Sequence, residues 1–239
     1  MWYSYTKTYH EILNYGKPES VKEDSYYKQR VEAEVTKRTY RSSKYSDWHQ
    51  EILSHAKGTV LDLGAGDGAF TGPMVLHGLR VVACDLSRTR LQNLKTSTSE
   101  LVELDATAIP FKPSVFDTVL FVEVLEHLPD RAAQQKLLAE LGQILKPGGV
   151  IVLTTPNRPV YRWMTFFWKW FGGQAPDPTH YSELSWPELE DLCREKFEIS
   201  YVRGKAGLIP IKAVQKYFSK RLHLCYDIMV VLKHKPKSV

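Results

Sequence analysis

A short apolar segment that runs directly into a glycine-rich turn constrains this chain more than any other feature. Residues 60–68 read VLDLGAGDG, with Gly64, Gly66 and Gly68 at alternating positions. In an α/β sheet, ligands bind beyond the carboxyl ends of the strands, and glycines there let the backbone approach a ligand closely. The amides at the start of the following helix are also available as donors. The segment therefore predicts a ligand-binding turn rather than a plain tight turn.

Beyond this turn, apolar or β-branched runs alternate with helical stretches. This alternation predicts βαβ units and a Rossmann-like, doubly wound α/β fold, with a mostly parallel seven-stranded sheet and helices on both faces. The expected strands are at 59–63, 80–85, 101–104, 117–122, 150–155, 198–203 and 226–232. The expected helices are at 47–56, 70–76, 88–95, 131–145 and 186–196.

Composition divides the chain and limits its class. We expect residues 1–56 to form an N-terminal helical or lid region, with a helix near 24–40, and residues 57–239 to form the main domain. Residues 157–185 show no strand pattern and predict an aromatic insertion over the sheet. The 239 residues are 43% hydrophobic and 25% charged, as in an ordinary globular protein. The three cysteines are scattered, so we expect no metal site, no disulfide framework and a cytoplasmic, reducing compartment.

Acidic residues follow the second and third expected strands. Asp85, followed by Leu86, ends one strand, and a carboxylate there can accept two hydrogen bonds from a ribose diol. Asp105, followed by Ala106, ends the next and could accept from an adenine amino group or cap the following turn. Because Gly64, Gly66 and Ala69 also satisfy the G-x-G-x-x-A dinucleotide pattern, these residues alone leave a nicotinamide cofactor open.

An ordered series of motifs favours a cofactor other than a nicotinamide. The segments VLDLGAGDG, VVACDLS, ELDATAIPF, FDTVLFVEVLEHL and LKPGGVIVLTTPN follow one another between residues 60 and 157. In this order they resemble the class I S-adenosylmethionine-dependent methyltransferases, and most of all the branch that includes the ubiquinone and menaquinone biosynthesis enzymes. The resemblance implies S-adenosylmethionine as the cofactor. It also implies a cofactor site formed by Asp62, Gly64, Ala65, Gly66, Gly68, Asp85, Leu86, Asp105, Ala106, Val122 and Glu123.

The resemblance implies methyl transfer to a small-molecule acceptor, and O-, N- and C-methylation all stay open. His127 and His180 are the candidate bases. The alternative for each is a structural role, with its ring hydrogen-bonded to nearby backbone. Arg38 or Arg41 would reach the cofactor carboxylate. The alternatives are a catalytically inactive cofactor-binding or regulatory subunit and an RNA methyltransferase. DNA is disfavoured, because the fourth strand is followed by VEVL rather than by an Asn/Asp-Pro-Pro-aromatic motif or a cysteine.

Two surface features bear on partners. Residues 199–239 carry nine lysines and arginines against one acid, Asp227, which favours a solvated basic face or contact with an anionic partner. The insertion holds Trp163, Phe166, Phe167, Trp168, Trp170 and Phe171. It is expected either to pack on the core as a lid helix, or to form a hydrophobic acceptor pocket or a peripheral membrane contact. A lipid-soluble phenol or quinol would suit the second alternative.

Overall fold

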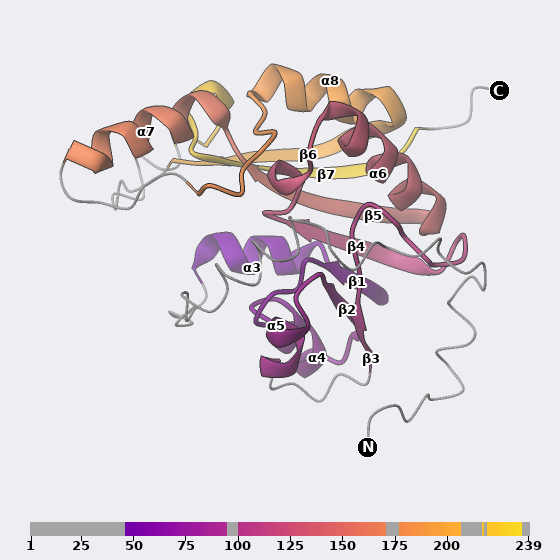
Figure 1. The fold of residues 1–239 in the computed structure, drawn as a ribbon. Helices are drawn as coiled ribbons and strands as arrows, with labels where there is room; N and C mark the ends of the chain where they lie inside the picture. The colour runs from indigo at the N-terminus through magenta and orange to yellow at the C-terminus, as the bar shows by residue number, and fades with distance from the viewer. Residues whose placement is uncertain (1–45, 95–99, 171–176, 207–216, 218, 236–239) are drawn as a thin grey trace.

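The structure, a computed structural model, describes residues 46–94, 100–170, 177–206, 217 and 219–235 (Figure 1). The helix expected near 24–40, and with it Arg38 and Arg41, lies outside these residues. The described part contains one sheet with helices on both faces, which confirms the Rossmann-like α/β prediction. The division at residue 56 stays a prediction.

The sheet has seven strands in the order β3-β2-β1-β4-β5-β7-β6. Every adjacent pair is parallel except the two pairs that include β7. The strand order reverses between β1 and β4, and open α/β sheets bind ligands at such a point, beyond the carboxyl ends of the strands. The strands are β1 (Thr59–Leu63), β2 (Arg80–Asp85), β3 (Glu100–Glu103), β4 (Phe116–Val122), β5 (Leu145–Pro156), β6 (Phe197–Lys205) and β7 (Asp227–His234).

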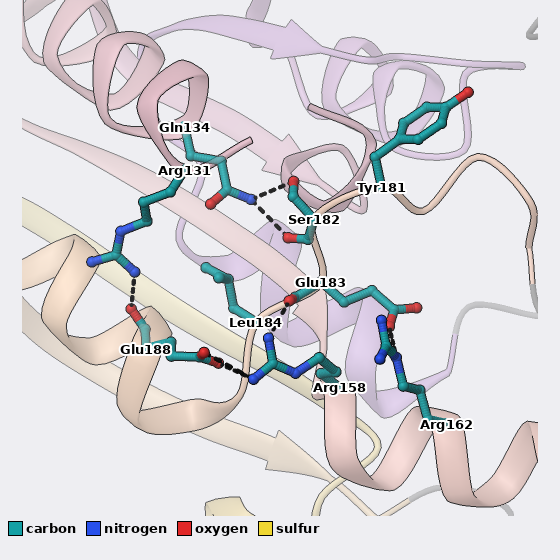
Figure 2. A pocket seen from close by; sticks show the side chains of 9 residues that line it. All are labelled: Arg131, Gln134, Arg158, Arg162, Tyr181, Ser182, Glu183, Leu184 and Glu188. Carbon is teal, nitrogen blue, oxygen red and sulfur yellow. Dashed lines mark hydrogen bonds and ion pairs between the residues drawn. The ribbon is translucent and has the colours of Figure 1, made fainter. Parts of the chain in front are cut away.

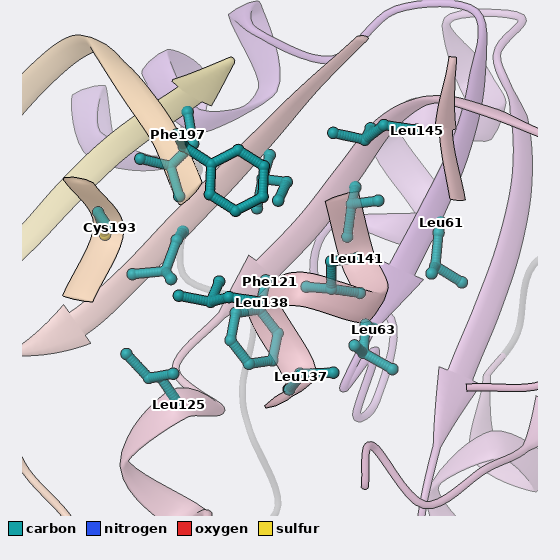
Figure 3. Close-up of a cluster of buried hydrophobic side chains, with 14 of the residues drawn as sticks. Leu61, Leu63, Phe121, Leu125, Leu137, Leu138, Leu141, Leu145, Cys193 and Phe197 are labelled. Carbon is teal, nitrogen blue, oxygen red and sulfur yellow. The ribbon is translucent and has the colours of Figure 1, made fainter. Parts of the chain in front are cut away.

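Each face of the sheet has its own apolar cluster, because successive strand residues point to opposite faces. Leu61 and Phe121 pack with α6 and α8 on one face, as Figure 3 shows. Val60 and Leu120 pack with α3 and α4 on the other face. The helices are α3 (Asp47–Ser54), α4 (Thr71–Leu76), α5 (Arg88–Asn93), α6 (Arg131–Ile144), α7 (Arg158–Trp170) and α8 (Trp186–Lys196).

Local hydrogen bonds explain why two helices begin where the sequence predicts. At the start of α6, the Asp130 carboxylate accepts from the backbone N of Ala133 at 2.8 Å. At the start of α8, the Glu188 carboxylate accepts from the backbone N of Ser185 at 2.8 Å, and Pro187 occupies the first turn. These contacts satisfy amides that have no partner within the helix, and Pro in the first turn loses no hydrogen bond.

The fifth strand begins earlier than predicted, since β5 starts at Leu145 rather than at residue 150. Leu145 pairs with Phe116, and the register then shifts before Thr118 pairs with Val150. Lys146 helps to hold this irregular segment, since its Nζ lies 2.7 Å from Asp117 Oδ2. The KPGG segment is therefore part of an irregular strand start and not a separate turn.

The last two strands differ from the rest of the sheet in direction. β6 and β7 pair antiparallel, with Lys205 opposite Asp227, and β7 is also antiparallel to β5. A short 3-10 helix, η2 (Leu222–Leu224), precedes β7. η2 packs against α7. In the described residues, no helix is both long and apolar enough to cross a membrane.

Asn157 connects three of these elements at the end of β5. Its side chain is 1% exposed, and its Nδ2 donates to the carbonyl oxygens of Leu222 at 3.0 Å and Cys225 at 2.9 Å. Its backbone N donates to the carbonyl of Tyr226 at 2.8 Å. The residue thereby fixes the start of α7 against η2.

We expect Asn157→Leu to lower the free energy of unfolding by about 2 kcal/mol or more, because buried carbonyls would lose their donor. Chemical denaturation of both proteins measures this difference. Gln92→Ala, at an exposed position of α5, is the control and should change the value by less than about 0.5 kcal/mol. An equal, small effect of both substitutions would contradict the structural role of Asn157.

Candidate active site

The glycine turn after β1 has a backbone that other residues would strain. Gly64, Gly66 and Gly68 have φ angles of +82°, +54° and +83°. A Cβ at Gly64 would overlap the side chain of Val124, and one at Gly68 would lie 2.9 Å from Leu94 Cδ2. Glycine is therefore required at both positions for the loop to lie this close to its neighbours.

Two acids lie on either side of this loop. The Asp62 carboxylate is buried and accepts a hydrogen bond from Thr71 Oγ1 at 2.5 Å. Burial raises the pKa of Asp62 to about 6. At the end of β2, Asp85 Oδ2 accepts from Gly66 N and Oδ1 from Ser87 N, each at 2.8 Å. Asp85 thus faces the glycine loop, where a carboxylate keeps lone pairs for further donors.

The other expected cofactor contacts surround this loop. Ala65 is buried, and its backbone N and that of Gly64 both donate to the Cys84 carbonyl at 2.8 Å. Leu86 and Val122 are half-buried. These positions lie at or just after the ends of β1, β2 and β4, at one edge of the sheet. Their part in binding a cofactor stays a prediction.

Asp105 lies one strand farther along and makes local contacts. Its Oδ1 accepts from the backbone N and from Oγ1 of Thr107, both at 2.8 Å. This is the turn-capping arrangement that the sequence left open beside adenine recognition. Ala106 is half-buried against the main apolar cluster. The cap uses only Oδ1 of Asp105, and the adenine contact expected from this pair stays a prediction.

Glu123, directly after β4, adopts a backbone conformation that is rare for its residue type. Its φ is +53°, in the left-handed region. Its Oε1 accepts from Thr154 Oγ1 at 2.6 Å, and its backbone N donates to the Thr154 carbonyl at 3.1 Å. Burial raises the pKa of Glu123 well above its usual value, and the nearby Asp227 and Glu126 carboxylates raise it further. Such strain is often found at functional sites.

The two expected histidines lie side by side, with ring centroids 4.9 Å apart. His127 Nδ1 lies 3.0 Å from both the carbonyl oxygen and Oγ1 of Thr179. This ring nitrogen is therefore engaged by Thr179. His180 is mostly buried, and its Nδ1 lies 3.2 Å from Glu183 Oε1. Its Nε2 lies 4.0 Å from Glu126 Oε1. His180 is therefore held between two carboxylates.

Charge determines how these groups hold protons. Burial lowers the pKa of His180, but the hydrogen bond to Glu183 and the charges of Glu126 and Asp177 outweigh it, so the net pKa is raised. Burial raises the pKa of Glu126 despite the two nearby histidines. Glu126 is fully buried, and its Oε1 has no hydrogen-bond partner among the described residues. The cluster thus contains a histidine and a neighbouring carboxyl group whose pKa values are both raised.

The same cluster has the composition of a metal site. One ligand atom each from Glu126, His127 and His180 lies within 4.8 Å of the other two. Imidazole and carboxylate ligands suit several divalent cations. The three cysteines form no metal-binding pattern, and the expectation of no metal site stays a prediction.

A surface pocket of about 440 Å³ lies beside this cluster, between α6, α7 and α8 (Figure 2). Arginines in it are already paired: Arg158 lies 2.8 Å from Glu188, and Arg162 lies 3.0 Å from Glu183 Oε2. The pocket includes no residue of the glycine turn or of the β2 end. We therefore place the candidate site at the carboxyl ends of the strands and not in this pocket. Glu183 belongs to both, because it contacts His180 and also lines the pocket.

Sequence reasoning missed three acids of the site. Glu126 lies within the VLEHL segment, and Glu183 lies three residues after His180, a spacing that could have marked the pair. Asp227 comes from β7, and its Oδ2 lies 3.0 Å from Lys205 Nζ. Nothing local in the sequence relates Asp227 to the other two, because it lies 101 residues after Glu126 and 44 residues after Glu183 and is brought there by the sheet.

Comparison with known proteins agrees with this geometry. A family described as a methyltransferase domain matches residues 38–196, well over half of the chain. Curated relatives include ubiquinone biosynthesis O-methyltransferases of Paracidovorax citrulli, 32% identical over 159 residues, and Albidiferax ferrireducens, 30% identical over 175. The matches cover 61% and 66% of this chain, and 65% and 67% of those proteins. The chain spans about half to two thirds of the curated relatives it matches.

Solved structures share the fold at low sequence identity. A SAM-dependent methyltransferase from Methanosarcina mazei is 19% identical with a TM-score of 0.57, over 77% of this chain and 96% of that one. One from Archaeoglobus fulgidus is 18% identical with a TM-score of 0.56, over 86% and 94%. The motif order, the strand order and the family match agree, and the resemblance to the ubiquinone branch is confirmed. The chain belongs to the class I S-adenosylmethionine-dependent methyltransferases, and S-adenosylmethionine is its cofactor.

Proposed function

We propose that this chain transfers a methyl group from S-adenosylmethionine to a hydroxyl oxygen of a small hydrophobic acceptor of the phenol or quinol class. The observation that carries the proposal is the position of His180, between Glu183 and Glu126 and in ring contact with His127. The names of the curated relatives, which are O-methyltransferases of ubiquinone biosynthesis, support oxygen as the acceptor atom.

The glycine turn and the acids around it would hold the cofactor. When bound, S-adenosylmethionine supplies an electrophilic methyl group, whose transfer leaves its sulfur neutral. Asp85 would bind the ribose hydroxyls, since its carboxylate lies at the end of β2 and faces the amide of Gly66 in the glycine turn. Gly66 is the more open position of the turn, since a Cβ placed there would meet only Arg90 Nη1, at 3.6 Å, and its backbone can be approached closely. The residues present therefore fit the cofactor.

A phenolic acceptor needs a base, because its pKa of about 10 keeps it protonated at neutral pH. With its Nδ1 proton donated to Glu183, His180 has its Nε2 lone pair available to accept the hydroxyl proton. Glu183 then stabilises the charged imidazolium, and burial keeps competing water away. This arrangement fits the role of a general base.

Aromatic side chains next to His180 suit an aromatic acceptor. The ring of Tyr161 lies 5.0 Å from that of His180 and 5.6 Å from that of Tyr226. Rings at such separations pack favourably in offset or tilted arrangements. The buried thiols of Cys84 and Cys193, which form no disulfide, support our further proposal of a reducing, cytoplasmic compartment.

The function is tested by incubating the full chain with S-adenosylmethionine and separate panels of quinols, phenols, lipid head groups and RNA. Mass spectrometry then identifies any methylated product. Methylation of a phenol or quinol oxygen supports the proposal. Cofactor binding without any product would favour an inactive binding subunit, and methylated RNA would favour a nucleic-acid substrate.

We expect Asp85→Asn to weaken S-adenosylmethionine binding by about 10- to 100-fold, because a charged acceptor is lost from the ribose contact. Isothermal titration calorimetry measures this change. Asp191→Asn, an exposed acid on α8, is the matched control and should leave the dissociation constant unchanged. Equal affinities for both variants would remove Asp85 from the cofactor site.

We expect His180→Gln to lower kcat by about 10²- to 10⁴-fold on a phenolic acceptor while cofactor affinity stays within about twofold. The change removes the proton acceptor but leaves the glycine turn intact. His77→Gln, at an exposed position after α4, is the control. Unchanged turnover by His180→Gln would rule out this base.

The pH profile separates the base from its supporting acid. His180 must be neutral to accept a proton, so kcat/KM should rise with pH through its pKa. Because Glu183 raises the pKa of His180, we expect Glu183→Gln to move this rise to lower pH and to reduce kcat. Glu190→Gln, which removes an exposed ion pair on α8, should leave the profile in place. A shift to higher pH, or none, would contradict the assignment.

A further inference from the structure

Helix α7 presents a row of large aromatic side chains to solvent. Trp163, Phe166, Phe167 and Trp170 are 65%, 65%, 53% and 79% exposed. Their spacing of i, i+3, i+4 and i+7 places all four on one side of the helix. The rings of Trp163 and Phe167 stack with centroids 5.7 Å apart. These residues, here called the aromatic face, do not pack on the core, so the expectation of a core-packed lid is wrong for them.

The opposite side of α7 is firmly attached to the rest of the structure. Tyr161 and Thr165 are buried, and Arg162 Nε lies 3.0 Å from Glu183 Oε2. Arg158 Nη2 lies 2.8 Å from Glu188 on α8. The aromatic face is therefore held outward by an anchored helix.

Basic and further apolar side chains belong to the segment beside α7. η2 packs against α7, and Leu224 in η2 is 53% exposed. Lys220 and Arg221, just before η2, are also exposed. The Arg221 guanidinium lies 3.8 Å from the ring centre of Tyr217, whose side chain is 57% exposed. Residues 158–170 themselves contain no acid.

We propose that the aromatic face of α7, with Lys220 and Arg221, docks on the surface of an anionic phospholipid bilayer. Interfacial helices typically expose Trp and Phe on one side and carry basic residues at the flanks, which attract anionic head groups. Four partly exposed aromatics offer roughly 500 Å² of apolar surface, less than the roughly 800 Å² per partner of a stable dimer. The charge and the area therefore favour a lipid surface over a second copy.

The position of α7 gives this docking a consequence for catalysis. α7 follows directly after β5, at the same edge of the sheet as the turn after β4 that carries Glu126 and His127 (Figure 1). A docked α7 would bring this edge close to the lipid, where a hydrophobic acceptor partitions. Only this consequence rests on the proposed function, because docking itself needs neither cofactor nor acceptor.

The test is co-sedimentation of the full chain with vesicles of phosphatidylcholine alone and of phosphatidylcholine with phosphatidylglycerol. We expect binding to the anionic vesicles, weakened by salt, and at least about tenfold weaker for the double variant Phe166→Glu/Trp170→Glu. Lys220→Glu/Arg221→Glu should weaken binding by a similar factor. Leu76→Glu changes an exposed apolar residue on α4 and should bind as the wild type does.

The outcomes distinguish a lipid surface from a second copy of the chain as the partner of the aromatic face. No sedimentation with anionic vesicles, or equal sedimentation of wild type and Phe166→Glu/Trp170→Glu, overturns the proposal. Light scattering that shows a dimer abolished by the same double variant assigns the face to a second copy instead. Because no methyl acceptor is present, failure of the proposed activity leaves these results unaffected.

Discussion

The site depends on the hydrogen bonds that tie the glycine turn to the end of β2. The Cys84 carbonyl accepts from both Gly64 and Ala65, while the Asp85 carboxylate accepts from Gly66. The loop after one strand is thus fixed by its neighbour, at the point where the strand order reverses. Without this tie, the left-handed glycines would gain conformational freedom in the loop, and the crevice would have to form only when a ligand binds, at an entropic cost.

Buried charge is the second constraint on the molecule. Glu123, Glu126 and Asp227 lie close enough to affect one another's protonation, and desolvation raises the pKa of each. Carboxyl groups in such surroundings reduce stability unless they are neutral or paired. Within the described part of the chain, only Asp227 has an ion-pair partner at hydrogen-bond distance, Lys205, whereas Glu123 and Glu126 each accept a hydrogen bond from a threonine hydroxyl. Perturbed acids gather at functional sites because catalysis needs unusual proton affinities. A catalytic role explains this cluster of acids better than a contribution to the stability of the fold does.

The sequence predicts the fold well because its signals are local. The bounds of β1, β2 and α8 agree with the prediction, since each has a continuous apolar or amphipathic pattern with clear ends. The predicted start of β5, residue 150, was wrong. The strand begins at Leu145 because this residue pairs with Phe116, which is distant in the sequence. The sequence predicts His180 as a candidate base but does not indicate its proximity to Glu126, which depends on a loop that returns to the end of β4. Tertiary contacts therefore limited the prediction of the site more than that of the fold.

Glu183 links the inner site to the outer surface of the protein. One of its oxygens contacts His180, and the other contacts Arg162 on α7. Burial raises the pKa of Glu183, but His180 and Arg162 outweigh it and hold the pKa below its usual value. A displacement of α7 that broke the Arg162 contact would raise the pKa of Glu183 toward its usual value. The Glu183 carboxylate would no longer be shared with Arg162, so it would interact more strongly with His180 and make that histidine more basic. By this route, the position of α7 on a surface would bear on the proton affinity of the base, without any direct contact between the aromatic face and the acceptor.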